Sequence, residues 1–242
     1  MKETVYLLSI SGLLQEPDAG NDCREAWKKL DRERLEKAER IRGQTHRLAE
    51  CIGAGLLLQL GVQEWQRGTL FCGESNAGEW RIEELSLPKL LESLEEPVAV
   101  AYAYGAHGKP FFKDIPLFFS LSHSGEYVLC AFSDREVGAD IQQMKPVESG
   151  KLIKRFFSQK EQAEWEALPS ETEKRDYFYR QWVRREAYGK LTGEGIFTKL
   201  GNDEEYGADC RFWENSIINA NYRIAICRYR DKEQDSDREK EK

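Results

Sequence analysis

Residues 127–142 read YVLCAFSDREVGADIQ, two largely apolar runs separated by a charged turn of four residues. Short apolar runs rich in aromatic and β-branched residues, bounded by turn residues, are typical of buried strands. We therefore predict strands over Tyr127–Phe132 and Val137–Gln142. A short polar connection favours antiparallel pairing, so the two strands are expected to form a hairpin around residues 133–136.

Helical patterns lie on both sides of this pair of strands. Upstream, Leu48–Leu60 is a continuous apolar helix candidate. Downstream, Ser158–Glu161 reads SQKE, the signature of a helix capping box. A longer helix is predicted from about Glu173 to Leu191, ending at Gly193. Further strand candidates are Val5–Ile10, Leu117–Leu121 and Tyr222–Tyr229. The mixture predicts an α+β fold.

The pattern breaks at Gly105-Ala106-His107-Gly108-Lys109-Pro110, which is typical of a loop or linker. Blocks of similar size lie on either side of it. We predict an N-terminal α+β half over residues 1–105 and a C-terminal half over residues 106–230 that carries the polar motifs. Residues 231–242 are all polar or charged, which predicts a disordered tail.

Composition excludes several classes of function. The chain has 242 residues and a formal net charge of -7, which argues against a nucleic-acid partner. Its apolar runs are shorter than a membrane span, and the first residues lack a signal-peptide layout, so we expect a cytoplasmic protein without a membrane partner. Six separated cysteines without a Cys-x-x-Cys pair fit a reducing compartment. The three histidines lack zinc-ligand spacing.

Asp140 and Gln142 are two residues apart on a predicted strand, so their side chains leave the same face. A carboxylate and an amide oxygen in this arrangement offer two positions to a hard cation such as Mg²⁺. An aspartate at the end of an apolar strand also serves as a turn former or helix cap. The motif alone leaves both interpretations open.

Trp182, Glu186 and Lys190 are spaced at i, i+4 and i+8 on the long predicted helix and share one face. One interpretation is an aromatic core contact followed by an ordinary surface pair of Glu and Lys. The other places a carboxylate and an ammonium group one turn apart beside a phosphate-rich ligand, where the carboxylate binds metal or accepts a proton.

Two loop-like motifs precede these residues. Ser120-Leu121-Ser122-His123-Ser124-Gly125 joins two predicted strands, and its hydroxyls and histidine suit either an anion cradle or incidental hydrogen bonds. It lacks the glycines of a nucleophile elbow. Gly108-Lys109-Pro110 is either a rigid wall that presents Lys109 to a ligand or a plain turn.

These motifs occur in a fixed order along residues 105–196: GKP, SLSHSG, VGADI and WVRREAYGK. In this order they resemble the larger, Sfp-type class of 4′-phosphopantetheinyl transferases, whose length this chain also matches. Before residue 105 the resemblance rests mainly on Arg47, ahead of an apolar helix.

The resemblance implies a pseudo-dimer of two similar α+β halves with coenzyme A bound at their interface. It implies a magnesium ion, or manganese in its place, on Asp140 and Glu186, with Gln142 as the third candidate ligand. Glu186 and Lys190 become the catalytic candidates. The residues expected to contact coenzyme A are Arg47, Gly108, Lys109, Pro110, Ser122, His123 and Lys190, with His123 near the 3′-phosphate.

The implied reaction moves the phosphopantetheine group of coenzyme A onto a serine of an apo acyl, peptidyl or aryl carrier protein and releases 3′,5′-ADP. Fatty-acid, secondary-metabolite and siderophore pathways all use such carriers. A pseudo-dimer implies a monomer. Gln142 stands where many members of the family have an acid, so a coenzyme A- or carrier-binding protein without turnover is the alternative. A metal-dependent phosphodiesterase lacks the further histidines or acids it would need.

Overall fold

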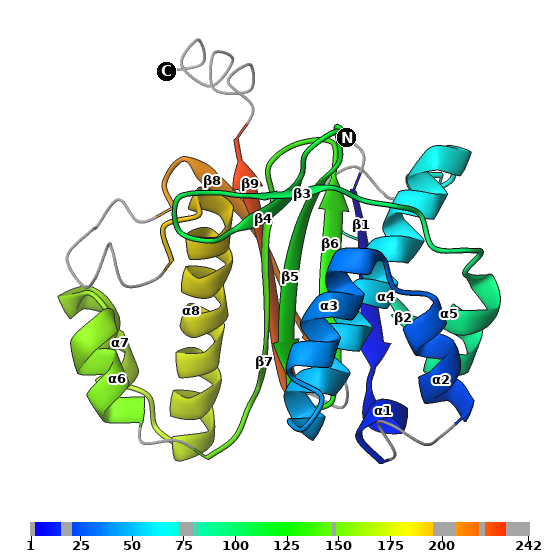
Figure 1. Ribbon diagram of the computed structural model, residues 1–242. Coiled ribbons are helices and arrows are strands. Elements are labelled where there is room, and N and C mark those ends of the chain that lie inside the picture. Colours follow the sequence, from blue (N-terminus) through cyan, green and yellow to red (C-terminus); the bar gives the residue numbers. More distant parts are fainter. Residues whose placement is uncertain are drawn as a thin grey trace, which may run out of the picture.

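The structure is a computed structural model that describes residues 3–15, 21–72, 80, 82–146, 149–195, 207–217 and 221–230. Helices and sheets are both present, which confirms the α+β class (Figure 1). The predicted disordered tail, residues 231–242, lies outside the described residues. Among the residues described, no helix is long and apolar enough to cross a membrane.

The first sheet has the strand order β2-β1-β6-β5. Its strands are β1 (Glu3–Ser9), β2 (Ile82–Leu85), β5 (Phe118–Ser124) and β6 (Tyr127–Ser133). β6 pairs antiparallel with both β1 and β5, whereas β1 and β2 are parallel. The stretch that was predicted to join two strands, Ser120–Gly125, is mostly strand: its serines belong to β5, and only Gly125 and Glu126 form the turn.

The second sheet has the order β7-β9-β8, built from β7 (Gly138–Gln143), β8 (Cys210–Ile217) and β9 (Tyr222–Tyr229). The predicted hairpin between Tyr127–Phe132 and Val137–Gln142 is therefore wrong. Both segments are strands, but β6 is already paired on both edges, and β7 pairs with β9 instead. Residues 134–137 carry the chain from one sheet to the other.

The helices surround these sheets. They are α1 (Ser11–Gln15), α2 (Asn21–Lys28), α3 (Arg32–Arg40), α4 (Thr45–Arg67), α5 (Leu87–Ser93), α6 (Ser149–Phe156), α7 (Gln159–Glu166) and α8 (Glu171–Thr192). The predicted capping box begins α7, with Ser158 and Glu161 each bonded to the other's backbone. α8 ends at Gly193, which has the left-handed φ of 75° expected of a helix-ending glycine.

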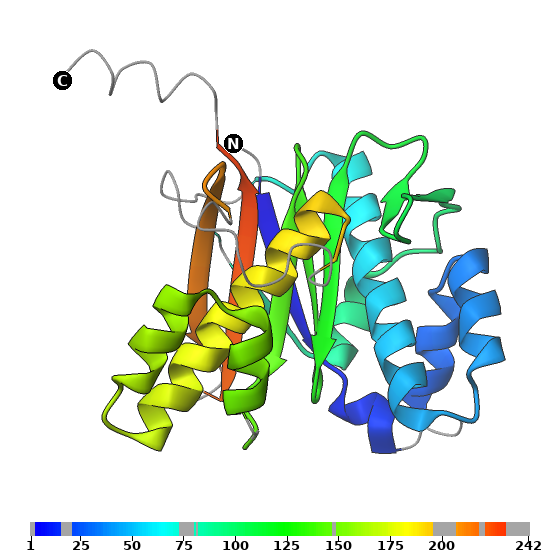
Figure 2. The same cartoon turned by 90° about the vertical axis from the view of Figure 1, so that its left-hand side faces the viewer.

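The described elements stack in four layers, from α4 through the two sheets to α8. One apolar cluster joins α4 to the first sheet, a second lies between the two sheets, and a third joins the second sheet to α8. Along β7, Ala139 and Ile141 face the cluster between the sheets. Asp140 alternates with them and lies on the opposite face, toward α8. Figure 2 shows α8 running diagonally across these strands.

A short hairpin lies at the expected boundary between the halves. β3 (Tyr102–Tyr104) pairs antiparallel with β4 (Pro110–Phe112), and residues 105–109 form its tip. The first sheet also takes strands from both sides of residue 105, because β1 and β2 precede it and β5 and β6 follow it. The division into residues 1–105 and 106–230 stays a prediction.

Candidate active site at the seam between the sheets

The two sheets meet where the edge strand β5 lies beside the edge strand β7. Every second residue of β5 is a serine in this stretch. Each hydroxyl oxygen accepts a hydrogen bond from a backbone N–H of β7: Ser120 from Ala139 (2.9 Å), Ser122 from Ile141 (3.3 Å) and Ser124 from Gln143 (3.0 Å). Serine side chains thus take the place of backbone carbonyls between β5 and β7. They give hydrogen-bond partners to buried N–H groups, which would be costly to leave unpaired.

Asp140 is the polar centre of this seam, with only 1% of its surface exposed. Its Oδ1 accepts hydrogen bonds from the Ser122 hydroxyl at 2.6 Å and from the Lys190 ammonium at 2.7 Å. Its Oδ2 accepts one from the Gln142 side-chain amide at 3.2 Å. A buried carboxylate needs such partners to remain charged, and here they come from β5, β7 and α8.

Glu186 lies one helical turn before Lys190 on α8, in the field of the same aspartate. Burial raises the pKa of Glu186, and the nearby negative charge of Asp140 raises it further, while Lys190 acts in the opposite direction. Two acids, 46 residues apart in sequence, therefore face one region of the seam. Their mutual repulsion favours a cation or a proton between them. Trp182, a turn earlier, packs on Phe156 and Phe178 as a core residue.

The donor set here suits a hard divalent cation. Two carboxylates and one amide side chain converge, and oxygen is the ligand that Mg²⁺ prefers. Within the described ranges, three His, Cys, Asp or Glu side chains do not gather closely enough to hold an ion by themselves. Asp140 and Glu186 would therefore hold a cation together with the Gln142 oxygen, water or oxygens of a bound ligand.

His123, the next residue after Ser122, points to the other face of β5, toward α4. Its Nδ1 lies 2.9 Å from Oε1 of Glu50, and Nδ1 of His46 lies 3.0 Å from the same oxygen. Burial lowers the pKa of His123, helped by Lys190 and opposed by Glu50. His46 and Glu50 were not among the residues predicted from the sequence. Their i, i+4 spacing on an apolar helix was the available signal.

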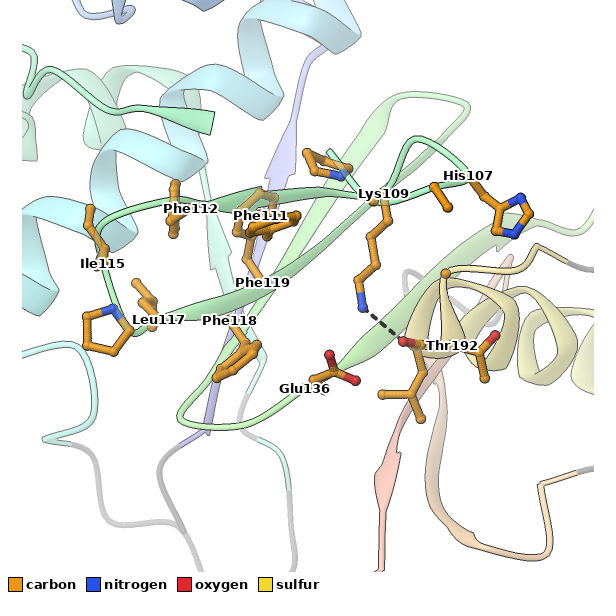
Figure 3. A pocket seen from close by; sticks show the side chains of 16 residues that line it. His107, Lys109, Phe111, Phe112, Ile115, Leu117, Phe118, Phe119, Glu136 and Thr192 are labelled. Atoms are coloured by element: carbon orange, nitrogen blue, oxygen red, sulfur yellow. Dashed lines mark hydrogen bonds between the residues drawn. The ribbon is translucent and has the colours of Figure 1, made fainter. Parts of the chain in front are cut away.

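The remaining predicted contact residues lie at the edges of the site. Arg47 is exposed in the first turn of α4, where its Nη1 donates to Gln44 at 2.6 Å. Lys109 points to the end of α8 and donates to the Leu191 carbonyl at 3.0 Å; burial lowers its pKa (Figure 3). The structure does not bring Arg47 or the Lys109 ammonium to Asp140 through any described contact.

Two cavities flank the hairpin tip. A cavity of about 270 Å³ is lined by the Gly108-Lys109-Pro110 stretch, by Ser120 and Leu121 of β5 and by Lys190. A second cavity, of about 540 Å³, lies beyond Lys109 and is mainly apolar, with aromatic walls from β4 and β5 (Figure 3). Only the smaller one includes Lys190, so it connects the hairpin tip to the polar seam.

Residues 136–228 match the model of the 4′-phosphopantetheinyl transferase superfamily. The segment includes Asp140, Gln142, Glu186 and Lys190. The match covers the part of the chain that supplies β7, α8 and the second sheet.

Named transferases are similar over comparable lengths. The chain is 43% identical to 4′-phosphopantetheinyl transferase psf-1 of Bacillus pumilus, over 50% of this chain and 57% of that one. It is 38% identical to 4′-phosphopantetheinyl transferase Sfp of Bacillus subtilis (strain 168), over 42% of this chain and 45% of the relative. To AcpT of Escherichia coli (strain K12), it is 34% identical over 51% and 64%. The chain thus spans about half the length of the curated relatives it matches.

Proposed function

We propose that the chain transfers the 4′-phosphopantetheine group of coenzyme A to a serine hydroxyl of an apo carrier protein and releases 3′,5′-ADP. One observation carries the proposal: the segment that matches the transferase superfamily holds Asp140, Glu186 and Lys190, and the fold gathers them at one seam. The names of psf-1, Sfp and AcpT support the same reaction.

The reaction forms a bond between the serine oxygen of the carrier and the phosphorus at the pantetheine end of the pyrophosphate. The bond from that phosphorus to the bridging oxygen breaks, and 3′,5′-ADP leaves with the electron pair. We assign acceptance of the serine proton to Glu186 or to a water it holds, because its raised pKa brings its basicity closer to neutral pH. Lys190 would donate to phosphoryl oxygens and offset their growing negative charge.

We assign the cation site to Asp140, Glu186 and Gln142. A magnesium ion bound there, or manganese in its place, would supply electrostatic stabilisation of the pyrophosphate. Ser122 and Lys190 hold the Asp140 carboxylate in place from two sides. Lys190 must share Asp140 with the ion, so we expect its ammonium to turn toward the phosphates when coenzyme A is bound.

We place the adenine end of coenzyme A at the smaller cavity, against Gly108, Lys109 and Pro110. This cavity opens beside Lys190, which lets one ligand reach both the hairpin tip and the seam. Lys109 then acts as a wall stabilised by the end of α8, and its ammonium remains on the Leu191 carbonyl. We assign His123 and Arg47 to the phosphates farther from the reacting bond. The proposed site takes residues from both sides of residue 105, from α4 before it and from β5, β7 and α8 after it. We infer from this a pseudo-dimer that works as a monomer.

The deciding experiment combines the chain with coenzyme A, magnesium and separate apo acyl, peptidyl and aryl carriers, followed by intact-mass measurement. We expect one carrier class or more to gain the mass of one phosphopantetheine group. Glu186→Gln should abolish the gain. Glu36→Gln, which removes an exposed acid paired with Arg32, serves as the matched control and should retain it.

Each other outcome counts against a defined part of the proposal. Binding of coenzyme A without transfer to any of the three carriers supports the alternative, a binding protein without turnover. Failure to bind coenzyme A contradicts both. Chelation of divalent ions should stop the transfer, and magnesium should raise the melting temperature of the wild-type chain but not of Glu186→Gln.

A further inference from the structure

The β3–β4 hairpin presents its tip, residues 105–109, to the smaller cavity. The tip is closed by its own backbone: the Gly105 N–H donates to the Lys109 carbonyl and the Gly108 N–H donates to the Gly105 carbonyl, both at 2.9 Å. Gly108 has a φ of 83°, a left-handed conformation that glycine adopts without strain. Because the tip is a closed turn, the two strands that carry it determine where it lies.

Helix α3 holds β3 through two tyrosines. Tyr102 and Tyr104 are two residues apart on the strand and so share one face. The Tyr102 hydroxyl donates to Oδ2 of Asp31 at 2.9 Å, and the Tyr104 hydroxyl donates to Glu33. Asp31 has 3% of its surface exposed, whereas Tyr104 is 57% exposed, so water competes only for the second bond. A two-stranded hairpin has little stability of its own, and the buried contact with Asp31 is therefore the one expected to fix it.

Asp31 uses its two carboxylate oxygens for two different elements. Oδ1 accepts a hydrogen bond from the backbone N–H of Arg34 at 3.0 Å and so caps the N-terminus of α3. Oδ2 accepts the Tyr102 hydroxyl, and the Arg34 guanidinium lies over the ring of that tyrosine, 5.4 Å from its centroid. A helix cap needs one side-chain oxygen, which serine or threonine also supplies. The second oxygen of Asp31 is therefore what connects α3 to the hairpin.

Tyr102 also packs toward the wall of the cavity. Its ring centroid lies 5.7 Å from that of Phe112, the residue opposite it on β4, and Phe112 lies 4.5 Å from Phe119 of β5. Phe119 lines the smaller cavity together with the hairpin tip. At the tip, the Lys109 ammonium bonds the Leu191 carbonyl at the end of α8. The hairpin is thus held from α3 through Tyr102 and from α8 through Lys109.

We propose that Asp31 is a positioning residue for the nucleotide end of coenzyme A, because its bond to the Tyr102 hydroxyl fixes the hairpin tip at the smaller cavity. The inference rests on the proposed function, which places the adenine end against this tip. Asp31 acts through the hairpin and not on the reacting atoms at the seam. Loss of the anchor should therefore weaken binding of coenzyme A without slowing the transfer step.

The test measures steady-state transfer to an apo carrier, together with calorimetric binding of coenzyme A in the absence of carrier. Tyr102→Phe removes the hydroxyl and keeps the ring, and Asp31→Ser keeps the helix cap but has no second oxygen for Tyr102. We expect each variant to raise the KM and the Kd for coenzyme A about three- to tenfold, the range for one hydrogen bond. The kcat and the KM for the carrier should not change.

Further variants test whether Asp31 and Tyr102 act as one unit. Asp31→Ser combined with Tyr102→Phe should raise the KM no further than either change alone, because both break the same bond. Asp31→Asn keeps the cap and a polar group for the Tyr102 hydroxyl, so its KM should be close to that of the wild type. Tyr104→Phe is the matched control, because it breaks an exposed bond between the same strand and the same helix, and its KM should rise less than about twofold.

Three results would overturn the inference. If Tyr102→Phe and Asp31→Ser lower the melting temperature but leave the KM and Kd for coenzyme A unchanged, the bond serves stability only. Additive effects in the double variant, or an equal rise with Tyr104→Phe, would show that Asp31 does not act through Tyr102. A fall in kcat, or an equal rise in the KM for the carrier, would show a general disruption of the site. All three leave the proposed function standing, whereas a wild type that neither binds coenzyme A nor transfers its phosphopantetheine group would remove both.

Discussion

The two long helices, α4 and α8, pack on different sheets in opposite ways. Fifteen of the 23 residues of α4 are buried, and its contact with the first sheet is apolar along most of its length. Seven of the 22 residues of α8 are buried, and its contact with β7 includes Asp140, Glu186 and Lys190. α4 therefore mainly supplies core: its first turns direct Glu50 toward His123 of β5, and farther along Gln59 and Gln63 bond backbone groups of residues 95–98. α8 supplies polar groups from its middle.

The closeness of α8 to β7 gives the largest expected effect. A Cβ at Gly138 would lie 1.9 Å from the Ala187 carbonyl oxygen and 2.6 Å from the Leu191 nitrogen, both backbone atoms of α8. Gly138→Ala must displace the helix, so we expect the free energy of unfolding to fall by about 3 kcal/mol or more and transfer to be lost. Urea unfolding and the carrier-mass assay measure the two effects.

The matching changes on α4 test whether the difference between the helices is real. A Cβ at Gly61 would lie 2.1 Å from the buried Phe132 ring, whose side-chain atoms are its three nearest neighbours, and alanine in a helix gains up to about 1 kcal/mol over glycine. Gly61→Ala should therefore cost less than Gly138→Ala. A Cβ at Gly55 would lie 2.5 Å from Cδ2 of the buried Leu30, again a side-chain atom, so Gly55→Ala should also cost less than Gly138→Ala. Equal losses at positions 61 and 138 would contradict the special role of the α8 contact.

The serine seam gives the next effect. Ser122→Ala leaves the buried N–H of Ile141 without its partner and removes a donor to Asp140, so we expect a loss of about 1–3 kcal/mol in unfolding free energy. Ser124→Ala is the matched control, because it also bonds β7 but does not bond Asp140. Only Ser122→Ala should raise the magnesium concentration needed for half-maximal transfer. If both variants do so, the seam acts through packing alone.

The sequence allowed the elements to be predicted better than their partners. Strand and helix periodicity located β6, β7 and α8, and local rules located the capping box and the Gly193 end. The hairpin between β6 and β7 failed because pairing depends on β1 and β9, which are distant in sequence. Local patterns contain no information about which edge another strand already occupies.

The site shows the same limit. The spacing of residues 186 and 190 on one helix face was visible, and the order of motifs linked them to Asp140. The role of the alternating serines of β5 could not be predicted. Their hydroxyls bond β7, and the sequence does not show that β7 lies beside β5. Glu50 was missed since its neighbours His46 and His123 come together only when α4 packs on the first sheet.

Glu186→Gln should separate stability from activity on α8. Burial and Asp140 raise the pKa of Glu186 above the ordinary 4.5 of a glutamate side chain, so ionising it costs folding free energy. Below pH 4.5 the acid is protonated in both states and the variant should match the wild type. As pH rises through the raised pKa, the wild type loses stability that the variant keeps. We expect the variant to melt about 1–3 °C higher at pH 7, without transferring.

The control for this pH effect is Glu36→Gln, where the acid is exposed and paired with Arg32 across one turn. Its melting temperature should follow the wild type at every pH, because exposed pairs contribute little. A Glu186→Gln variant that melts lower than the wild type at pH 7 without divalent ions would show that the carboxylate is already satisfied. The repulsion from Asp140 would then not be the force that recruits a cation.

Substitution of Gln142 gives the smallest expected effect and tests the polar contact between β7 and α8 most finely. Its amide donates to Oδ2 of Asp140 at 3.2 Å, a bond that needs no ion. Gln142→Glu replaces this donor with a third acid beside Asp140 and Glu186. Without magnesium the three charges repel, so the variant should be less stable than the wild type. With magnesium the added charge strengthens cation binding, and half-maximal transfer should need several-fold less of the ion.

A titration of transfer rate against magnesium measures this, with Gln143→Glu, the next residue along β7 and on its other face, as the control. An unchanged magnesium requirement in Gln142→Glu would mean that this side chain does not contact the ion, and would leave Asp140 and Glu186 to hold it with ligand oxygens and water.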